Sequence, residues 1–154
     1  MLSNRTMLMF KPDCVAGFRH GEDTVRLRHL LNQVAAAGSE GGEEWRMEMG
    51  ARVHITENMA AKLYEEHKGK PFCAALVNFV TSAPSFVSVW SCEGAPAWEV
   101  GRGAVGLIRS RYGRDDLSVT GPANLLHGSD GPESAKREVR WAIKCFILRC
   151  AEEG

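Results

Sequence analysis

Short extended segments alternate with amphipathic ones along the whole chain, and this order constrains the fold more than any other feature. The extended apolar segments are Thr6–Phe10, Trp45–Val53, Ser85–Trp90 and Asn124–His127. Helical spacing of apolar residues marks segments 23–37, 56–66, 72–80, 96–101 and 132–146. This order of strands and helices predicts an α+β sandwich, in which helices cover an antiparallel sheet.

Local signals set the expected ends of several helices. Thr56 is a suitable N-cap for the helix that runs toward residue 66, because its hydroxyl can accept a free backbone N–H. Glycines near Gly103 and Gly106 are expected to interrupt the helix that begins at Pro96. Residues 107–123 are rich in charge and turn formers, which indicates a connection ahead of the last strand.

Length and charge restrict the classes of protein that fit the chain. A chain of 154 residues can bury about 70% of its unfolded surface, so residues 1–154 are expected to form one domain. Lysine plus arginine and aspartate plus glutamate both number 19. This balance predicts no membrane association and no specific binding to nucleic acid, so any phosphate binding has to come from a local cluster of cations.

The five cysteines show no CxxC spacing and are odd in number, which argues against a disulfide framework or a zinc site. The N-terminus lacks the basic and apolar regions of a secretory signal, and no apolar run approaches eighteen residues. The expectation is a protein with reduced thiols in the cytoplasm.

One histidine has the setting of a nucleophile. His127 ends the apolar run that starts at Asn124, stands just before Gly128, and precedes a helix that can return a carboxylate toward the ring. An imidazole is largely neutral at pH 7, and a carboxylate partner can fix which nitrogen carries the proton. From this segment alone, a surface histidine in a turn is an equal alternative.

Three segments together resemble the nucleoside diphosphate kinases, and with the stretches between them they cover nearly the whole chain. They are Arg5–Asp13 (RTMLMFKPD), Tyr64–Phe72 (YEEHKGKPF) and Asn124–Glu138 (NLLHGSDGPESAKRE). That family moves the terminal phosphate of a nucleoside triphosphate to a nucleoside diphosphate through a phosphohistidine. The resemblance implies that His127 is phosphorylated, and that the fold is a ferredoxin-like βαββαβ sandwich with four antiparallel strands covered by helices.

The resemblance also implies a set of phosphate-binding residues. Lys11, Arg102 and Arg109 correspond to the family's cations, and Tyr64 to a tyrosine whose hydroxyl reaches a phosphate or the lysine. A count back from His127 selects Arg114 in place of Arg109, so both arginines stay open. Without the resemblance, Lys11 reads as an exposed lysine and Tyr64 as a helix contact.

Further positions match groups that hold the nucleoside and the histidine. Phe72 resembles the aromatic residue that stacks on the base, with Leu76 beside it, although Leu76 equally suits the core. Asn124 resembles the amide that contacts the ribose together with the lysine. Glu138 resembles the carboxylate that bonds the catalytic ring, and Ser129 its hydroxyl partner.

No cluster of side chains in the sequence has the spacing of a protein metal site. Mg²⁺ is therefore expected to bind through the phosphates of the nucleoside tri- and diphosphates. There is also no GxxxxGK[ST] loop, so phosphate recognition differs from that of P-loop enzymes. A homo-oligomer is expected by resemblance.

The chain departs from the family pattern in one notable place. Only Gly103–Ile108 separates Arg102 from Arg109, where relatives have a longer loop with a threonine donor and contacts between subunits. Residues 118–122 and 39–44 are additional to the usual pattern. The alternative function is therefore a weakly active or inactive nucleotide-binding or structural module of the same fold, for example in a cilium or flagellum.

Overall fold

The centre of the molecule is a four-stranded sheet. The computed structural model describes residues 4–42, 44–112 and 124–153. The sheet contains β1 (Arg5–Phe10), β4 (Glu44–Val53), β5 (Ser85–Glu93) and β6 (Leu126–Gly128) in the order β4-β5-β1-β6. Every neighbouring pair is antiparallel. Strands β1 and β5 lie at the centre, and the ten-residue β4 and the three-residue β6 form the two edges.

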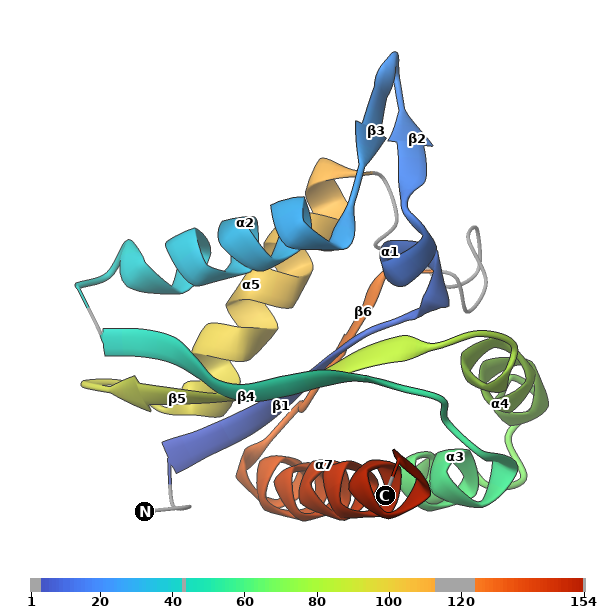
Figure 1. The fold of residues 1–154 in the computed structure, drawn as a ribbon. Helices are drawn as coiled ribbons and strands as arrows, with labels where there is room; N and C mark the ends of the chain where they lie inside the picture. The colour runs from blue at the N-terminus through green and yellow to red at the C-terminus, as the bar shows by residue number, and fades with distance from the viewer. Residues whose placement is uncertain (1–3, 43, 113–123, 154) are drawn as a thin grey trace.

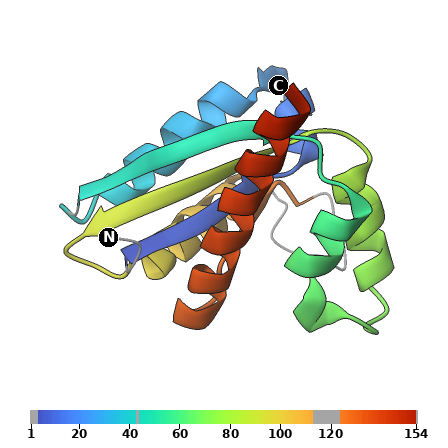
Figure 2. The same cartoon turned by 60° about the horizontal axis from the view of Figure 1, so that its bottom comes forward.

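Helices cover both faces of this sheet (Figure 1). Helices α2 (Leu27–Ser39) and α5 (Ala97–Arg111) lie on one face. The other face carries α7 (Pro132–Glu153), α3 (Glu57–Leu63) and α4 (Cys73–Thr81), with the short η2 turn (Glu65–His67) after α3. Turning the molecule shows α7 crossing the strands obliquely (Figure 2). The predicted ferredoxin-like α+β sandwich is confirmed.

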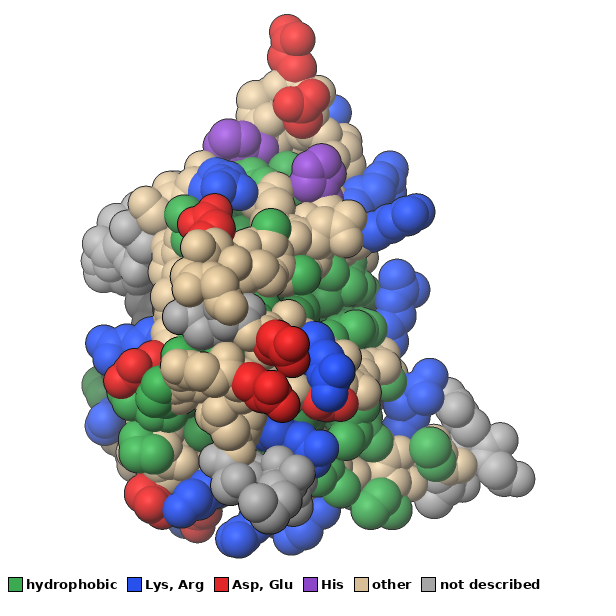
Figure 3. Space-filling model, turned by 90° about the vertical axis from the view of Figure 1, so that its left-hand side faces the viewer, with side chains coloured by type: hydrophobic (Ala, Val, Ile, Leu, Met, Phe, Trp, Pro, Cys, Tyr) green, Lys and Arg blue, Asp and Glu red, His purple; other side chains and the backbone are tan. Residues whose placement is uncertain are grey.

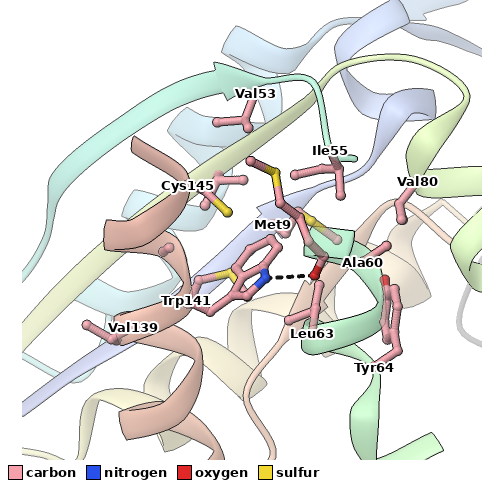
Figure 4. Packing of buried hydrophobic residues seen from close by; sticks show 14 of the residues in the cluster. Met9, Val53, Ile55, Ala60, Leu63, Tyr64, Val80, Val139, Trp141 and Cys145 are labelled. Atoms are coloured by element: carbon pink, nitrogen blue, oxygen red, sulfur yellow. Dashed lines mark hydrogen bonds between the residues drawn. The ribbon is translucent and has the colours of Figure 1, made fainter. Parts of the chain in front are cut away.

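Strand β1 contributes to both halves of the core because alternate side chains of a strand point to opposite faces. Leu8 and Phe10 pack into the cluster under α2 and α5, together with Trp45. Met7 and Met9 join the opposite cluster under α3, α4 and α7. In that cluster Trp141 Nε1 donates to the carbonyl of Met59 at 2.9 Å and ties α7 to α3 (Figure 4).

The segment before α2 differs from the expected helix. Asp23–Val25 forms β3, which pairs with β2 (Phe18–His20), and helix α2 begins only at Leu27. Gly21, with φ +62°, makes the tight turn between the two strands. Val25 ends this hairpin and is buried. Its apolar side chain therefore matches the helical spacing of the segment, although the residue itself lies in a strand.

Lys11 is followed by a helix that the sequence did not predict. Helix α1 (Pro12–Ala16) starts at Pro12, where the missing N–H of proline costs no intrahelical hydrogen bond. Its first turn brings Asp13 and Cys14 back toward the start of β6, as their contacts with Leu125 show.

The predicted interruption of α5 is wrong. The helix continues through Gly103 and Gly106, since both glycines face open space while Ala104, Val105 and Ile108 are buried on the sheet side. The six residues between Arg102 and Arg109 are thus helical. Arg114 and the additional residues 118–122 lie outside the described residues.

Within the described part of the chain, no helix is long and apolar enough to cross a membrane. On the face drawn in Figure 3, acidic and basic side chains are interspersed. The formal net charge of the whole sequence is zero. These features agree with the expectation that anion binding depends on a local group of cations.

Candidate active site

His127 is held by a carboxylate from a different element. It lies on β6, opposite Met9 of β1. Its Nε2 atom is 2.7 Å from Oε1 of Glu138, and Ser129 Oγ donates to the same oxygen at 3.0 Å. Glu138 and Ser129 are both buried. An ionised carboxylate can only accept hydrogen bonds, so this contact favours the tautomer with the proton on Nε2 and leaves Nδ1 with a free lone pair.

A cation, Arg137, lies near the other oxygen of this carboxylate. Arg137, the residue before Glu138 on α7, places Nη2 at 2.8 Å from Oε1 of Glu66 and 3.7 Å from Oε2 of Glu138. Its Nη1 donates to the carbonyl of Leu63 at 3.4 Å. Arg137 thus ties α7 to the α3–η2 segment. Sequence reasoning did not select it, because nothing but its place beside Glu138 marks it.

Lys11 and Asn124 form a buried pair at the end of β1. Lys11 is only 3% exposed, and its Nζ donates to Oδ1 of Asn124 at 2.6 Å. Burial, and next the nearby charge of Arg109, lower the pKa of Lys11 to about 8. The predicted exposed alternative for Lys11 is therefore wrong.

Arg109 reaches the same region from the last turns of α5. Its Nη2 donates to the carbonyl of Leu126, one residue before His127. Its Nε is buried without a hydrogen-bond partner among the described residues. Burial lowers the pKa of Arg109, but a guanidinium stays charged at physiological pH. Two close cations, one with an unused donor, make a site suited to an anion.

Tyr64 lies edge-on to His127. The ring centroids of Tyr64 and His127 are 6.0 Å apart, with an interplanar angle of 89°. The hydroxyl is buried and has no partner within the described part of the chain. Burial, and next the charge of Glu138, raise the pKa of Tyr64, so the phenol stays a neutral donor. Figure 4 shows its ring beside Leu63 and Ala60.

A series of rings leads from His127 to the surface. Tyr64 is followed by His67 at 6.3 Å between centroids, and His67 by Phe72 at 5.2 Å. Phe72, directly before α4, is 44% exposed, and Lys70 Nζ lies 5.9 Å from its ring. Such an exposed aromatic face can stack on a nucleobase.

Two further observations concern this segment. His67 has a buried Nδ1 without a partner among the described residues, which marks it as a polar group that the sequence reasoning missed. The sequence places His67 between the aromatic residues Tyr64 and Phe72, and this pattern could have identified His67 as a candidate. Leu76 is 6% exposed and belongs to the core cluster, so the core alternative for this residue is the one that its burial supports.

Arg102 lies apart from the other predicted residues. It is exposed on α5, two turns before Arg109 and about 10 Å away along the helix axis. The preceding residue, Gly101, faces Thr6 and Leu8 of β1. No hydrogen bond or ion pair within the described ranges joins Arg102 to the cluster.

The structure therefore brings together groups from five elements or element ends. They are His127, Ser129, Asn124, Lys11, Arg109, Tyr64 and Glu138. A neutral ring nitrogen, two cations and a phenol donor suit phosphoryl transfer, which depends on positioning and charge stabilisation. No group of three or more metal-ligating His, Cys, Asp or Glu side chains occurs among the described residues.

Comparison with known proteins places this chain in a class of phosphotransferases. The family model described as nucleoside diphosphate kinase matches residues 4–146. The nucleoside diphosphate kinase of Bacillus licheniformis is 34% identical over 146 residues, covering 91% of this chain and 88% of that protein. The Bacillus cereus enzyme is 35% identical over 141 residues, with 88% and 84% covered.

Solved structures agree with these relatives. A nucleoside diphosphate kinase from Halobacterium salinarum in complex with CDP has a TM-score of 0.66 and 29% identity, covering 90% of this chain and 86% of that one. A family member from Babesia bovis has a TM-score of 0.65 and 28% identity, with the same coverage. The chain therefore belongs to the nucleoside diphosphate kinase family and is an enzyme of the kind that this name describes. The alternative of an inactive structural module is not favoured.

Proposed function

We propose that the protein transfers the γ-phosphate of a nucleoside triphosphate to a nucleoside diphosphate in two steps, through a phosphohistidine at His127. The observation that carries this proposal is the 2.7 Å contact between His127 Nε2 and Glu138, which leaves Nδ1 as the free nucleophile. Nucleophilic catalysis of this kind needs a nucleophile, an orienting partner and nearby charge stabilisation.

In the first step the Nδ1 lone pair forms a bond to the γ-phosphorus, and the bond from that phosphorus to the β–γ bridging oxygen breaks. The nucleoside diphosphate leaves with that electron pair, and the Nε2 proton remains hydrogen-bonded to Glu138. In the second step a terminal phosphate oxygen of another nucleoside diphosphate attacks the phosphorus, and Nδ1 recovers its electron pair. Ser129 keeps Glu138 in place through both steps.

Lys11, Arg109 and Tyr64 are proposed to stabilise the charge on the moving phosphoryl group. Their support is the burial of Lys11, the unused Nε of Arg109 and the unpartnered Tyr64 hydroxyl. We add His67, whose buried Nδ1 can donate to a phosphate in its protonated or Nδ1–H form. Arg102 stays a predicted phosphate contact that acts from its exposed position on α5.

The nucleoside is proposed to lie between the ring series and the end of β1. Phe72 would stack on the base, and Asn124 with Lys11 would contact the ribose. The relative from Halobacterium salinarum was solved with CDP, which supports a nucleoside diphosphate as ligand. Stacking accepts any base, so broad base tolerance follows. Leu76 would support Phe72 from the core.

Mg²⁺ is proposed to bind through the nucleotide phosphates. Asp130, which is exposed and follows Ser129 in the sequence, is proposed to contact at most one water of the ion. The ion would neutralise phosphate charge when bound, while Lys11, Arg109 and His127 position the reacting groups.

We also propose that residues 1–154 form one domain of this family, supported by the match over residues 4–146. A homo-oligomer is supported by exposed methionines, Met47 and Met49, on the edge strand β4. A cytoplasmic location is supported by the free cysteines of the described chain.

The test is to incubate the protein with γ-labelled ATP and Mg²⁺ and to measure acid-labile, base-stable label. The wild-type protein should take up label and lose it when a nucleoside diphosphate is added. His127→Ala should take up none, whereas His54→Ala, which changes an exposed histidine on the chain outside the site, should behave as wild type. Label that persists in His127→Ala would contradict the proposal.

A further inference from the structure

A strained turn lies directly before the catalytic histidine. The Leu126 N–H donates to the carbonyl of Asn124 at 3.0 Å, and Leu125 between them has φ +77°. These features define the strained form of the γ-turn. Leu125 is the only non-glycine residue with positive φ among the described residues, and it is fully buried. A leucine in this conformation persists only where its surroundings hold it.

The surroundings that hold the turn come from α1. The Leu125 carbonyl accepts from the Lys11 N–H at 2.8 Å and from Cys14 Sγ at 3.0 Å. The Leu125 N–H donates to Oδ2 of Asp13 at 3.1 Å. Both polar groups of this buried residue are thus satisfied by residues 11–14.

Asp13 has a distinct part in this arrangement. The peptide group between Asn124 and Leu125 has its carbonyl bonded by Leu126 and its N–H bonded by Asp13. Fixing both ends of a peptide group fixes the orientation of its plane. The contacts of Lys11 and Cys14 act on the next peptide group, so they do not replace the contact of Asp13.

The orientation of this peptide plane affects the positions of Asn124 and His127. Asn124, on one side of the turn, accepts from Lys11 Nζ at 2.6 Å. On the other side, β6 starts at Leu126, whose carbonyl binds Arg109, and His127 follows. A relaxed turn would move Asn124, His127 and the Arg109 anchor together.

We propose that Asp13 is a positioning residue for phosphoryl transfer, whose carboxylate holds the strained turn at Leu125 and so sets Asn124 and His127. This inference rests on the proposed function of His127. It assigns Asp13 no contact with substrate.

Two substitutions at the same position separate the hydrogen bond from the negative charge. Asp13→Asn keeps a side-chain oxygen that can accept from the Leu125 N–H, whereas Asp13→Ala removes it. We expect Asp13→Ala to lower kcat/KM by about 100-fold, the scale of a small misplacement of reacting groups. Asp13→Asn should retain most of the activity. Asp23→Ala, which removes an exposed carboxylate from β3, is the matched control and should behave as wild type.

A double-mutant cycle with Leu125→Gly tests the link to strain. Glycine adopts positive φ without steric cost, so Asp13→Ala should lower kcat/KM by a smaller factor in the Leu125→Gly background than in the wild type. If Leu125→Gly does not fold, the comparison of Asp13→Ala with Asp13→Asn still decides the matter.

Hydrogen exchange of the Leu125 amide gives a readout that needs no activity. It should be faster in Asp13→Ala than in wild type, and slow in Asp13→Asn. The proposal is overturned if Asp13→Ala keeps wild-type kcat/KM, if Asp13→Asn is as impaired as Asp13→Ala, or if the Leu125 amide exchanges at the same rate in all three proteins. Wild-type protein that takes up no label would instead overturn the proposed function, and the exchange result would still test the turn.

Discussion

Glu138 determines which nitrogen of His127 is available, because its carboxylate occupies Nε2 at 2.7 Å. The proposed nucleophile, Nδ1 of His127, therefore depends on a residue eleven positions away that a different element supplies. Ser129 donates to the same carboxylate oxygen and limits its rotation. At the scale of single residues, we therefore expect the reactivity of His127 to depend on Glu138 and Ser129, which orient its ring.

Replacement of this carboxylate should impair the first step. We expect Glu138→Gln to lower the rate of His127 phosphorylation by about 100-fold, since the ring loses its fixed orientation and its preferred tautomer. Rapid-quench measurement of labelled protein checks this. Glu133→Gln is the matched control, because that carboxylate lies on the same helix and its side chain is 88% exposed. Equal rates for the two variants would refute the role of Glu138.

Lys11 should make nucleotide binding depend on pH. Its pKa in the folded protein is about 8, so the free site loses this cation as the pH rises above 8. The affinity for ADP should then fall by up to about tenfold per pH unit, the limit for one linked proton. Calorimetry at several pH values, in buffers of different ionisation enthalpy, should show proton uptake on binding. Lys144→Met, at an exposed position on α7, should keep this dependence, and Lys11→Met should lose it.

Lys11 also makes the free energy of unfolding depend on pH, and here a rise in pH is favourable. The folded pKa of about 8 lies below the ordinary value of 10.5, so the unfolded chain binds more protons between these two pH values. The contribution of Lys11 to the free energy of unfolding therefore rises as the pH increases from about 8 to 10.5. Urea unfolding of wild type and Lys11→Met across this range should show a slope that the variant lacks.

Helices place the charged groups at one end of the sheet. Helix α5 starts where Asn4 Oδ1 accepts from the Ala97 N–H and carries Arg109 in its last turn, beside β6. Because α5 is continuous, its length and direction set the position of Arg109. A loop in place of residues 103–108 would not fix the position of Arg109.

Two glycine substitutions test the helix packing. Gly106→Ala should stabilise the protein by about 0.5–1 kcal/mol, since Gly106 is inside α5 and a Cβ there meets nothing within 4 Å. Gly38→Ala should destabilise it by about 1–3 kcal/mol, because its Cβ would lie 2.1 Å from Cδ1 of Trp45. Trp45 cannot move easily, as it stacks on Trp90 and donates to the Val34 carbonyl. Thermal unfolding checks both; a destabilised Gly106→Ala would contradict a continuous α5.

The sequence predicts most elements because their signals are local. Apolar runs mark the sheet strands, and Thr56 accepts from the Met59 N–H as its N-cap position predicts. The β2–β3 hairpin and the continuity of α5 escape prediction, since Val25 fits two periodicities and the glycines are stabilised by packing of their neighbours. The pair of Lys11 with Asn124 was expected from resemblance, whereas a carboxylate partner for His127 was also expected from the helix that follows it, with resemblance selecting Glu138. The turn at Leu125 has no sequence signal, because leucine does not favour positive φ.

At the scale of the whole molecule, one sheet collects the site from distant parts of the chain. The order β4-β5-β1-β6 puts the end of β1 beside β6, which joins Lys11 to residues 124–127. Helices on opposite faces then reach the same end, α5 with Arg109 and α7 with Glu138. The ferredoxin-like arrangement explains how groups more than a hundred residues apart meet.

The edge of this sheet should also mediate self-association. Met47 and Met49 on β4 are 41% and 37% exposed, and an exposed edge strand can pair with another chain. Light scattering after gel filtration should give the wild-type protein a multiple of the 16.9 kDa chain mass. Met47→Lys/Met49→Lys should shift it toward 16.9 kDa, while Leu148→Lys on α7 should not. A monomeric wild type would contradict this expectation.

The most direct test of phosphoryl transfer through His127 is the position of the phosphate on the ring. Protein with ¹⁵N-labelled histidine would be phosphorylated with ATP and Mg²⁺ and examined by ³¹P and ¹⁵N NMR. Because Glu138 occupies Nε2, phosphorus should couple to Nδ1 of His127, and the signal should disappear when a nucleoside diphosphate is added. Coupling to Nε2, or a phosphorylated residue other than His127, would contradict the proposed mechanism.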